Sequence, residues 1–238
     1  MTLLINNLQF IVQGLAMTLA LAAVTLVIST LIAFALGTLA STRFRWLRWS
    51  VRVYVELFRD IPLIVNIFFV FFGAPLFGLE LSPFAAVTVG LSLWGGANGA
   101  EIVRGGFASV PRHQWLSAAA LGLKGWEIFL FVVGPQALKG ILPPFVGLLT
   151  LLVQATSLGA LVGVSEFFKV GQIIVERTTM MEGWNPAFAI YATVLLVYFV
   201  ICSCLTWFGR WLERRLQRDQ RQPAGGRVAV VEATAPLS

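Results

Sequence analysis

Long uncharged runs alternate with short polar or basic stretches along this chain. Five of the runs are at residues 10–40, 61–79, 81–100, 140–165 and 183–209. A helix that crosses a bilayer needs about 20 mostly apolar residues, and each run is close to that length or longer. A sixth apolar piece at residues 128–138 is too short to cross alone. The pattern predicts an all-α membrane protein with five transmembrane helices.

The composition agrees with that class. Of 238 residues, 58% are hydrophobic and 12% are charged, whereas a soluble domain carries about 25% charged residues. The net charge of +6 does not point to nucleic acid, because the arginines lie in short clusters beside apolar runs, as in juxtamembrane loops. Cys202 and Cys204 lie inside an apolar run without other metal-ligating residues, so we expect no metal site.

Basic residues predict the orientation, because Lys and Arg accumulate in the cytoplasmic loops of membrane proteins. They gather after the first, third and fifth runs, at Arg43, Arg45, Arg48, Arg52, Arg104, Arg112, Lys124, Lys139, Arg210, Arg214, Arg215, Arg218, Arg221 and Arg227. The other connections hold few. We therefore expect the N-terminus outside and the C-terminus in the cytoplasm.

The end of the chain differs from the rest in composition. Residues 220–238 are rich in Gly, Pro and Ala and have no helical period. Such segments bury too little apolar surface to fold. We expect a membrane domain at residues 1–219 and a disordered cytoplasmic tail at residues 220–238.

The cytoplasmic segment after the third run predicts a short helix. Ser109 and Pro111 suit its start, and Gly122 suits its end. Small residues lie between them at Ser117, Ala118, Ala119 and Ala120. A face of small residues lets another backbone approach closely, so this helix is either a docking element for a soluble partner or an ordinary interfacial helix.

Several other motifs occur in a fixed order on both sides of this segment. They are YVELFRDIPL at 54–63, AEIVRGG at 100–106, PQALKGILPP at 135–144 and TSL at 156–158. Together with residues 109–122 they resemble the bacterial ABC transporter permeases of the polar amino-acid uptake family, over residues 13–215. The resemblance implies the type I importer permease fold, the bacterial inner membrane, and a translocation path for polar amino acids that works by alternating access.

The resemblance also implies partners. They are a dimer of ATPase subunits, a second permease subunit that is either identical or different, and an external substrate-binding protein, in addition to membrane lipid. Residues 134–140 lack the Gly-Lys-Ser/Thr order of a phosphate-binding loop. We therefore expect no enzyme activity and no cofactor in this chain, with ATP and Mg²⁺ on the partner ATPase.

In such permeases the loop at 109–122 receives the ATPase through a coupling helix. The residues that match it are Pro111, Gln114, Leu116, Ser117, Ala118, Ala119, Ala120 and Gly122. The family's loop usually has glutamate and alanine at the positions of Leu116 and Ser117. We expect Ala118 and Ala119 to leave room for the ATPase surface, and Leu116 to add an apolar contact.

Polar residues inside the runs are the candidates for a cargo path. They are Asn66, Asn98, Gln154, Thr156 and Ser157. Polar groups are costly within a membrane unless they are paired, and hydrogen bonds between helices explain them as readily as contact with cargo. Two glycine pairs have the spacing of close helix packing, Gly95 with Gly99 and Gly159 with Gly163.

Three other functions are alternatives to this one. A secondary transporter needs ion-coupling residues at mid-membrane, and the charged residues lie at the ends of the runs. An intramembrane enzyme needs a catalytic set, and His113 is the single histidine. An assembly or regulatory subunit with weakened coupling stays open, because Leu116 and Ser117 depart from the family's loop.

Overall fold

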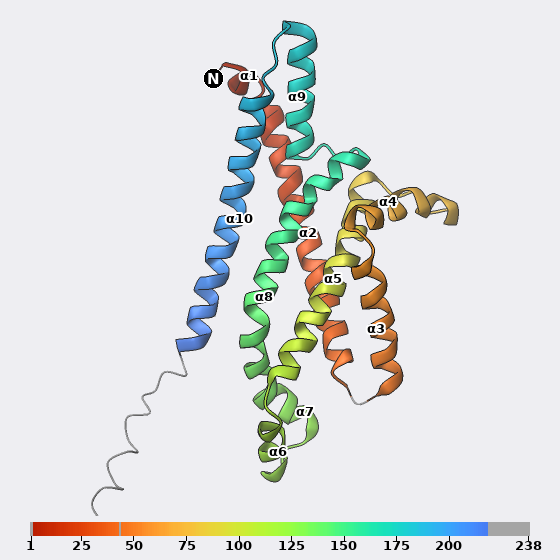
Figure 1. Ribbon diagram of the computed structural model, residues 1–238, viewed down its shortest axis with the longest axis vertical. Coiled ribbons are helices and arrows are strands. Elements are labelled where there is room, and N and C mark those ends of the chain that lie inside the picture. Colours follow the sequence, from red (N-terminus) through yellow and green to blue (C-terminus); the bar gives the residue numbers. More distant parts are fainter. Residues whose placement is uncertain (1, 43, 219–238) are drawn as a thin grey trace, which may run out of the picture.

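The computed structural model describes residues 2–42 and 44–218, and within these ranges the regular structure is helical (Figure 1). A short first helix, α1 (Thr2–Asn6), leads into the bundle. The expected disordered tail at 220–238 lies outside the described residues.

Three helices form the centre of the bundle: α2 (Leu8–Ala40), α5 (Pro83–Ser109) and α8 (Gly134–Ala155). Glycines on α5 let these helices approach closely. A Cβ added to Gly95 would lie 2.7 Å from the Ser29 hydroxyl of α2, and one added to Gly99 would lie 2.5 Å from Ala33 Cβ. The close packing predicted for this glycine pair is confirmed. For the other pair it is wrong at Gly163, which instead ends a helix at φ 93° with no atom near its missing Cβ.

The second predicted span is broken. α3 (Arg45–Asp60) and α4 (Leu63–Gly73), which continues into the 3-10 turn η1 (Ala74–Phe77), are bent by 101° relative to each other. The break lies at Ile61 and Pro62, because proline lacks an N–H and drives the preceding residue into the extended conformation. The run predicted as the second span, 61–79, is helical over Leu63–Phe77, and the break lies at its start, where α3 joins it. The apolar face of α3 that packs on the bundle was hidden among its arginines.

The fourth span begins earlier than expected. Residues Gly125–Val162 form one continuous helical stretch. It comprises α7 (Gly125–Glu127), the π-helical turn η2 (Ile128–Val133), α8 and the 3-10 segment η3 (Thr156–Val162). The piece at 128–138 is therefore part of this span and not a separate one. Pro135 directly follows the π-helical turn, where the regular α-helical bonding is already interrupted, since the Gly134 N–H bonds to the Phe129 carbonyl.

Between η3 and the last helix, α10 (Ala187–Arg218), lies a helix that was not predicted, α9 (Phe167–Glu182). Its buried positions recur every three or four residues, at Phe167, Val170, Gly171, Ile174 and Thr178. This period indicates an amphipathic helix. It was missed because Lys169 and Arg177 within it resemble loop residues.

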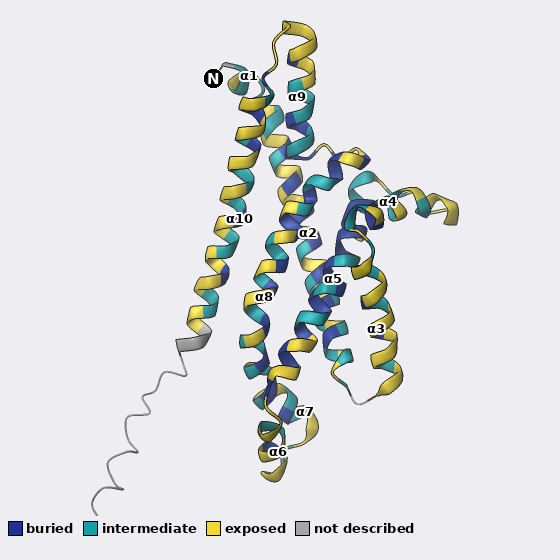
Figure 2. Cartoon of the chain, viewed as in Figure 1, coloured by how far each residue is buried: buried dark blue, intermediate teal, exposed yellow. Residues whose placement is uncertain are grey.

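By length and composition, three described helical segments can cross a membrane: α2, Gly125–Val162 and Ala187–Arg215. The bent pair α3–α4 is a fourth if it counts as one broken span. α5 falls outside this set because glycines and polar residues lower its hydropathy. Its surroundings explain its composition, since α5 is largely buried by protein whereas α10 is exposed along most of its length (Figure 2). Five spans stays a prediction.

Candidate coupling helix and translocation path

A short helix, α6 (Arg112–Ala120), follows α5 at one end of the bundle (Figure 1). Its inner side packs on its own chain: Ala118 is 4% exposed and, with Trp115, belongs to the main hydrophobic core beside η2. Its outer side is open, with Leu116 and the following Leu121 exposed at 59% and 82%. α6 therefore presents apolar side chains to the outside while one face anchors it.

The end of α6 has a defined backbone geometry. Gly122 has φ 82°, in the left-handed region. The Gly122 N–H donates to the Ala119 carbonyl at 3.0 Å, and the Leu123 N–H donates to the Ala118 carbonyl at 3.3 Å. This pair of bonds is the Schellman motif that ends helices at glycine. The glycine that the sequence singled out thus sets where α6 stops and turns toward α7.

The structure divides the eight predicted coupling residues into two groups. Those on the outside are Pro111, Leu116, Ser117, Ala119, Ala120 and Gly122. The Gln114 side chain is half-buried and accepts a 3.4 Å hydrogen bond from Gln136 of α8. Ala118 faces inward, so the expectation that it leaves room for a partner is wrong: its small size serves the contact between α6 and its own bundle.

The five polar path candidates do not lie together. Asn66 is buried, and its amide donates to the carbonyls of Phe58 at 3.2 Å and Ile61 at 3.4 Å. Those carbonyls belong to the broken end of α3, where helical partners are missing. Asn66 therefore stabilises the break between α3 and α4.

Two further candidates bond within their own helical segments. The Asn98 amide donates to the Trp94 carbonyl at 3.0 Å. The Thr156 hydroxyl, fully buried, donates to the Val153 carbonyl at 2.7 Å. The Ser157 hydroxyl also bonds within its own helical segment, to the Gln154 carbonyl at 2.8 Å, but Ser157 shares an open surface with Gln154.

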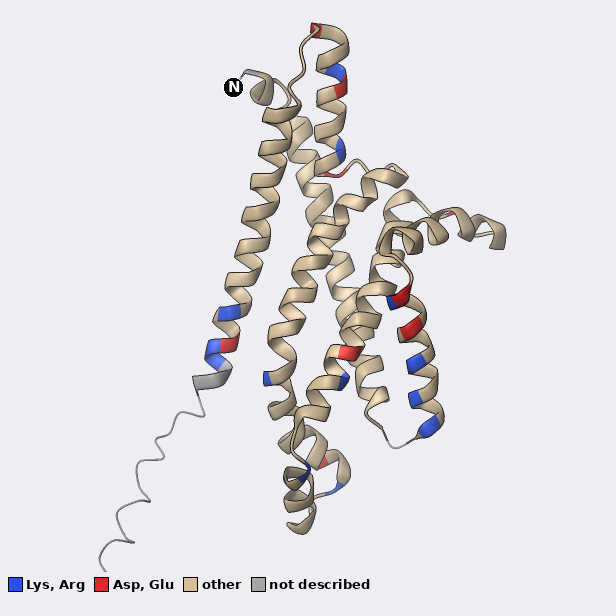
Figure 3. Cartoon of the chain, in the orientation of Figure 1, with Lys and Arg blue, Asp and Glu red and all other residues tan. Residues whose placement is uncertain are grey.

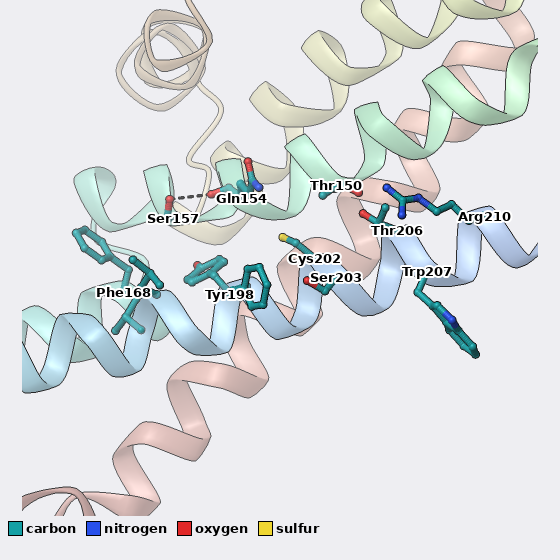
Figure 4. Close-up of a pocket in the computed structure, with 13 residues that line it drawn as sticks. Thr150, Gln154, Ser157, Phe168, Tyr198, Cys202, Ser203, Thr206, Trp207 and Arg210 are labelled. Carbon is teal, nitrogen blue, oxygen red and sulfur yellow. Dashed lines mark hydrogen bonds between the residues drawn. The ribbon is translucent and has the colours of Figure 1, made fainter.

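Gln154 and Ser157 line a cavity of about 730 Å³ between α8 and α10 (Figure 4). Its other polar lining residues are Thr150, Tyr198, Ser203, Thr206 and Arg210. Aromatic residues complete the wall, among them Phe168 and Trp207. Hydroxyl, amide and guanidinium groups can hydrogen-bond a polar solute, so this cavity offers such a solute several partners.

Glu166 is the functional candidate that the sequence analysis missed. It is fully buried and caps α9, where its carboxylate accepts hydrogen bonds from the N–H groups of Phe168 at 2.8 Å and Lys169 at 2.7 Å. It also accepts from the Tyr198 hydroxyl of α10 at 3.0 Å and the Thr18 hydroxyl of α2 at 3.4 Å. Burial raises the pKa of this carboxyl, and the four hydrogen bonds oppose that rise. An acidic residue just before an apolar-periodic run is the signal that could have found it.

Residues 30–218 match the family described as the binding-protein-dependent transport system inner membrane component. This chain belongs to that family. A probable amino-acid ABC transporter permease of Bacillus subtilis is 30% identical over 213 residues, covering 90% of this chain and 92% of the relative. A glutamine transport system permease of Escherichia coli is 31% identical over 210 residues, covering 87% and 93%.

Solved structures share the fold of this inner membrane component. An amino acid ABC transporter crystallised with histidines superposes with a TM-score of 0.79 at 23% identity, over 89% of this chain and 96% of the other. An inward-facing methionine ABC transporter gives 0.73 at 23% identity, over 89% and 98%. The family assignment made from the ordered motifs is confirmed, and the three other functions find no support.

Proposed function

We propose that this chain is the membrane-spanning permease subunit of an ATP-binding-cassette importer for polar amino acids, and that it forms the translocation path by alternating access. The observation that carries this proposal is the family match over residues 30–218, together with amino-acid permeases as relatives over nearly the whole chain. The helical fold supports it, because it matches two ABC transporters of known structure.

ATP hydrolysis belongs to a separate pair of ATPase subunits, which hold ATP and Mg²⁺. A second permease subunit completes the path, and an external binding protein delivers the amino acid. ATP binding can drive the cycle only if the ATPase pair interacts differently with the outward-open and inward-open states. α6 is the element through which the ATPase pair would act on the bundle. Leu116 and Leu121, which follows α6 directly, are exposed and offer the ATPase an apolar contact.

Five crossings account best for the path of the chain through a bilayer. They are α2, the bent pair α3–α4, α5, the stretch Gly125–Val162, and α10. α5 has 27 residues, about 40 Å of helix, which is long enough. An odd number of crossings with the basic clusters inside puts the N-terminus outside and the C-terminus in the cytoplasm.

The cavity lined by Gln154 and Ser157 is the proposed contribution of this chain to the cargo path. A polar amino acid carries a carboxylate, an ammonium group and a polar side chain. The lining offers hydrogen-bond donors for the carboxylate, from Arg210 and from several hydroxyl groups. Asn66, Asn98 and Thr156 would then affect the path indirectly, because their hydrogen bonds stabilise the helices that form it.

Uptake by proteoliposomes tests the function. Vesicles that hold this chain, its second permease subunit and the ATPase pair should accumulate a radiolabelled polar amino acid when ATP is enclosed with the ATPase and the binding protein is outside. Omission of the ATPase should abolish uptake. Uptake that instead follows an ion gradient without the ATPase would identify a secondary transporter and overturn the proposal.

A further inference from the structure

A groove of about 850 Å³ runs beside α3, away from the coupling helix and the polar cavity. Arginines of α3 and α5 line it: Arg45, Arg48, Arg52, Arg59 and Arg104. Two carboxylates share the groove, and both lie in ion pairs, Glu56 with Arg52 at 3.4 Å and Glu101 with Arg104. Because five cations face two anions, the groove is strongly basic.

The basic character is greatest where α3 begins. Neither Arg45 nor Arg48 has an ion-pair partner among the residues that the structure describes. The first turn of α3 contains no acidic side chain, so nothing offsets the positive end of the helix dipole. A guanidinium pair at a helix N-terminus is a favourable place for a phosphate, which arginine binds through two parallel hydrogen bonds.

An apolar stripe runs along α3 next to these arginines. Its members recur every three or four residues and are exposed: Trp46, Trp49, Val53 and Leu57. The opposite face of α3, with Val51 and Val55, is buried against α2 and α5. The exposed stripe therefore covers none of the chain's own core, and two of its residues are tryptophans, which favour the boundary between headgroups and acyl chains.

In the orientation proposed above, the groove lies at the level of the cytoplasmic membrane surface. Ala40, the last residue of α2, lines it. The basic residues of α3 and those near the end of α10 lie toward the same end of the bundle (Figure 3). Anionic lipids of the cytoplasmic leaflet attract basic segments at this level.

We propose that this groove and the exposed stripe beside it bind an anionic phospholipid, with its phosphate on Arg45 and Arg48 in the groove and its acyl chains along Trp49, Val53 and Leu57 of the stripe. A free phosphate would use the arginines but leave the apolar stripe in water, so a lipid fits the whole surface better. The proposal is independent of which solute the protein carries.

Native mass spectrometry of the full-length chain in detergent tests the site. With phosphatidylglycerol and phosphatidylcholine added at equal concentration, the wild type should retain the anionic lipid preferentially. Arg45→Gln with Arg48→Gln should weaken retention on the order of tenfold, since each basic residue near an anionic surface contributes severalfold. Thermal melting and gel filtration should show that this double variant is folded, because the side chains of Arg45 and Arg48 are exposed.

Three controls make the test specific. Arg214→Gln with Arg215→Gln removes the same charge from α10, outside the groove, and should leave lipid retention unchanged. An equal loss of lipid in both double variants would mean that only the net charge matters, and would overturn the site. Displacement of the lipid by millimolar inorganic phosphate would identify an anion site and contradict the proposal. Loss of the lipid from the assembled transporter would mean that a second subunit covers the groove, and would also contradict it.

Discussion

α6 is held mainly by contacts close in sequence, whereas the start of α9, far from it in the bundle (Figure 1), is held by side chains from three helices. The end of α6 rests on the two backbone bonds around Gly122. The start of α9 rests on Glu166, which bonds to its own helix and to Thr18 and Tyr198. Because α6 has one buried and one exposed face, it can dock a partner. The buried hydrogen bonds of Glu166 instead hold the helices of the bundle together. Substitutions should therefore affect stability at Glu166 and coupling at α6.

The largest loss of stability should come from Glu166→Leu. It removes the acceptor of four hydrogen bonds, and each buried donor left unpaired costs about 1–3 kcal/mol. We expect the purified chain to melt at a much lower temperature and to lose uptake. Glu176→Leu, an exposed position on the same helix, is the matched control and should change melting little. Equal melting of the two variants would show that the network does not hold the helices together.

A smaller but more selective effect is expected from Gly122→Val. A side chain in the left-handed region costs about 1–2 kcal/mol, and a β-branched one is at the upper end. The end of α6 should shift. The amount of ATPase that co-purifies with the chain (ATPase recovery) and the uptake of amino acid should therefore fall, while membrane insertion is retained. Gly125→Val lacks a positive φ and has no atom within 4 Å of the added Cβ, and should preserve both. Normal uptake in Gly122→Val would rule out a requirement for this geometry.

Substitutions at two neighbouring alanines should separate packing within the chain from docking to the ATPase. Ala118→Trp overfills a buried site, which costs about 1–3 kcal/mol, so it should lower the melting temperature of the chain alone. Ala119→Trp lies on the exposed side and should leave melting unchanged while it reduces co-purification of the ATPase. The opposite pattern, with only Ala119→Trp destabilising the isolated chain, would reverse the assignment of the two faces.

Leu116→Glu should give the smallest change. The resemblance to the family implies that glutamate is usual at this position, and Leu116 is 59% exposed, so the substitution should cost the fold little. We expect a severalfold gain in ATPase recovery if the partner keeps the family's surface. Pull-down of the ATPase with wild-type and variant chains at matched expression measures it, and a reduced yield would mean that the partner has adapted to leucine.

Local signals in the sequence predicted local structure well. Proline before and glycine after the small residues located α6, and glycine spacing on α5 predicted close helix packing, which the structure shows to be against α2. Features that depend on tertiary surroundings were missed. The apolar face of α3 was hidden among arginines, and Glu166 is held by Thr18 and Tyr198, which lie more than 30 residues away in sequence.

The candidate path shows the same limit. Five polar residues were equivalent in the sequence, yet four of them, including Ser157, bond to backbone carbonyls, and Gln154 and Ser157 line the cavity between α8 and α10. Nothing in the spacing of Gln154 and Ser157 distinguishes them from Thr156, because the side on which each one lies is set by the change from α-helix to 3-10 helix at residue 156.

The central claim is that ATP hydrolysis on a partner drives transport through this chain. ATP hydrolysis and amino-acid uptake, measured together on one preparation of proteoliposomes, test it most directly. For the wild type, both should rise when the loaded binding protein is added, and in Gly122→Val both should fall. Uptake that continues in Gly122→Val after hydrolysis has stopped, or that never depended on ATP, would contradict the account.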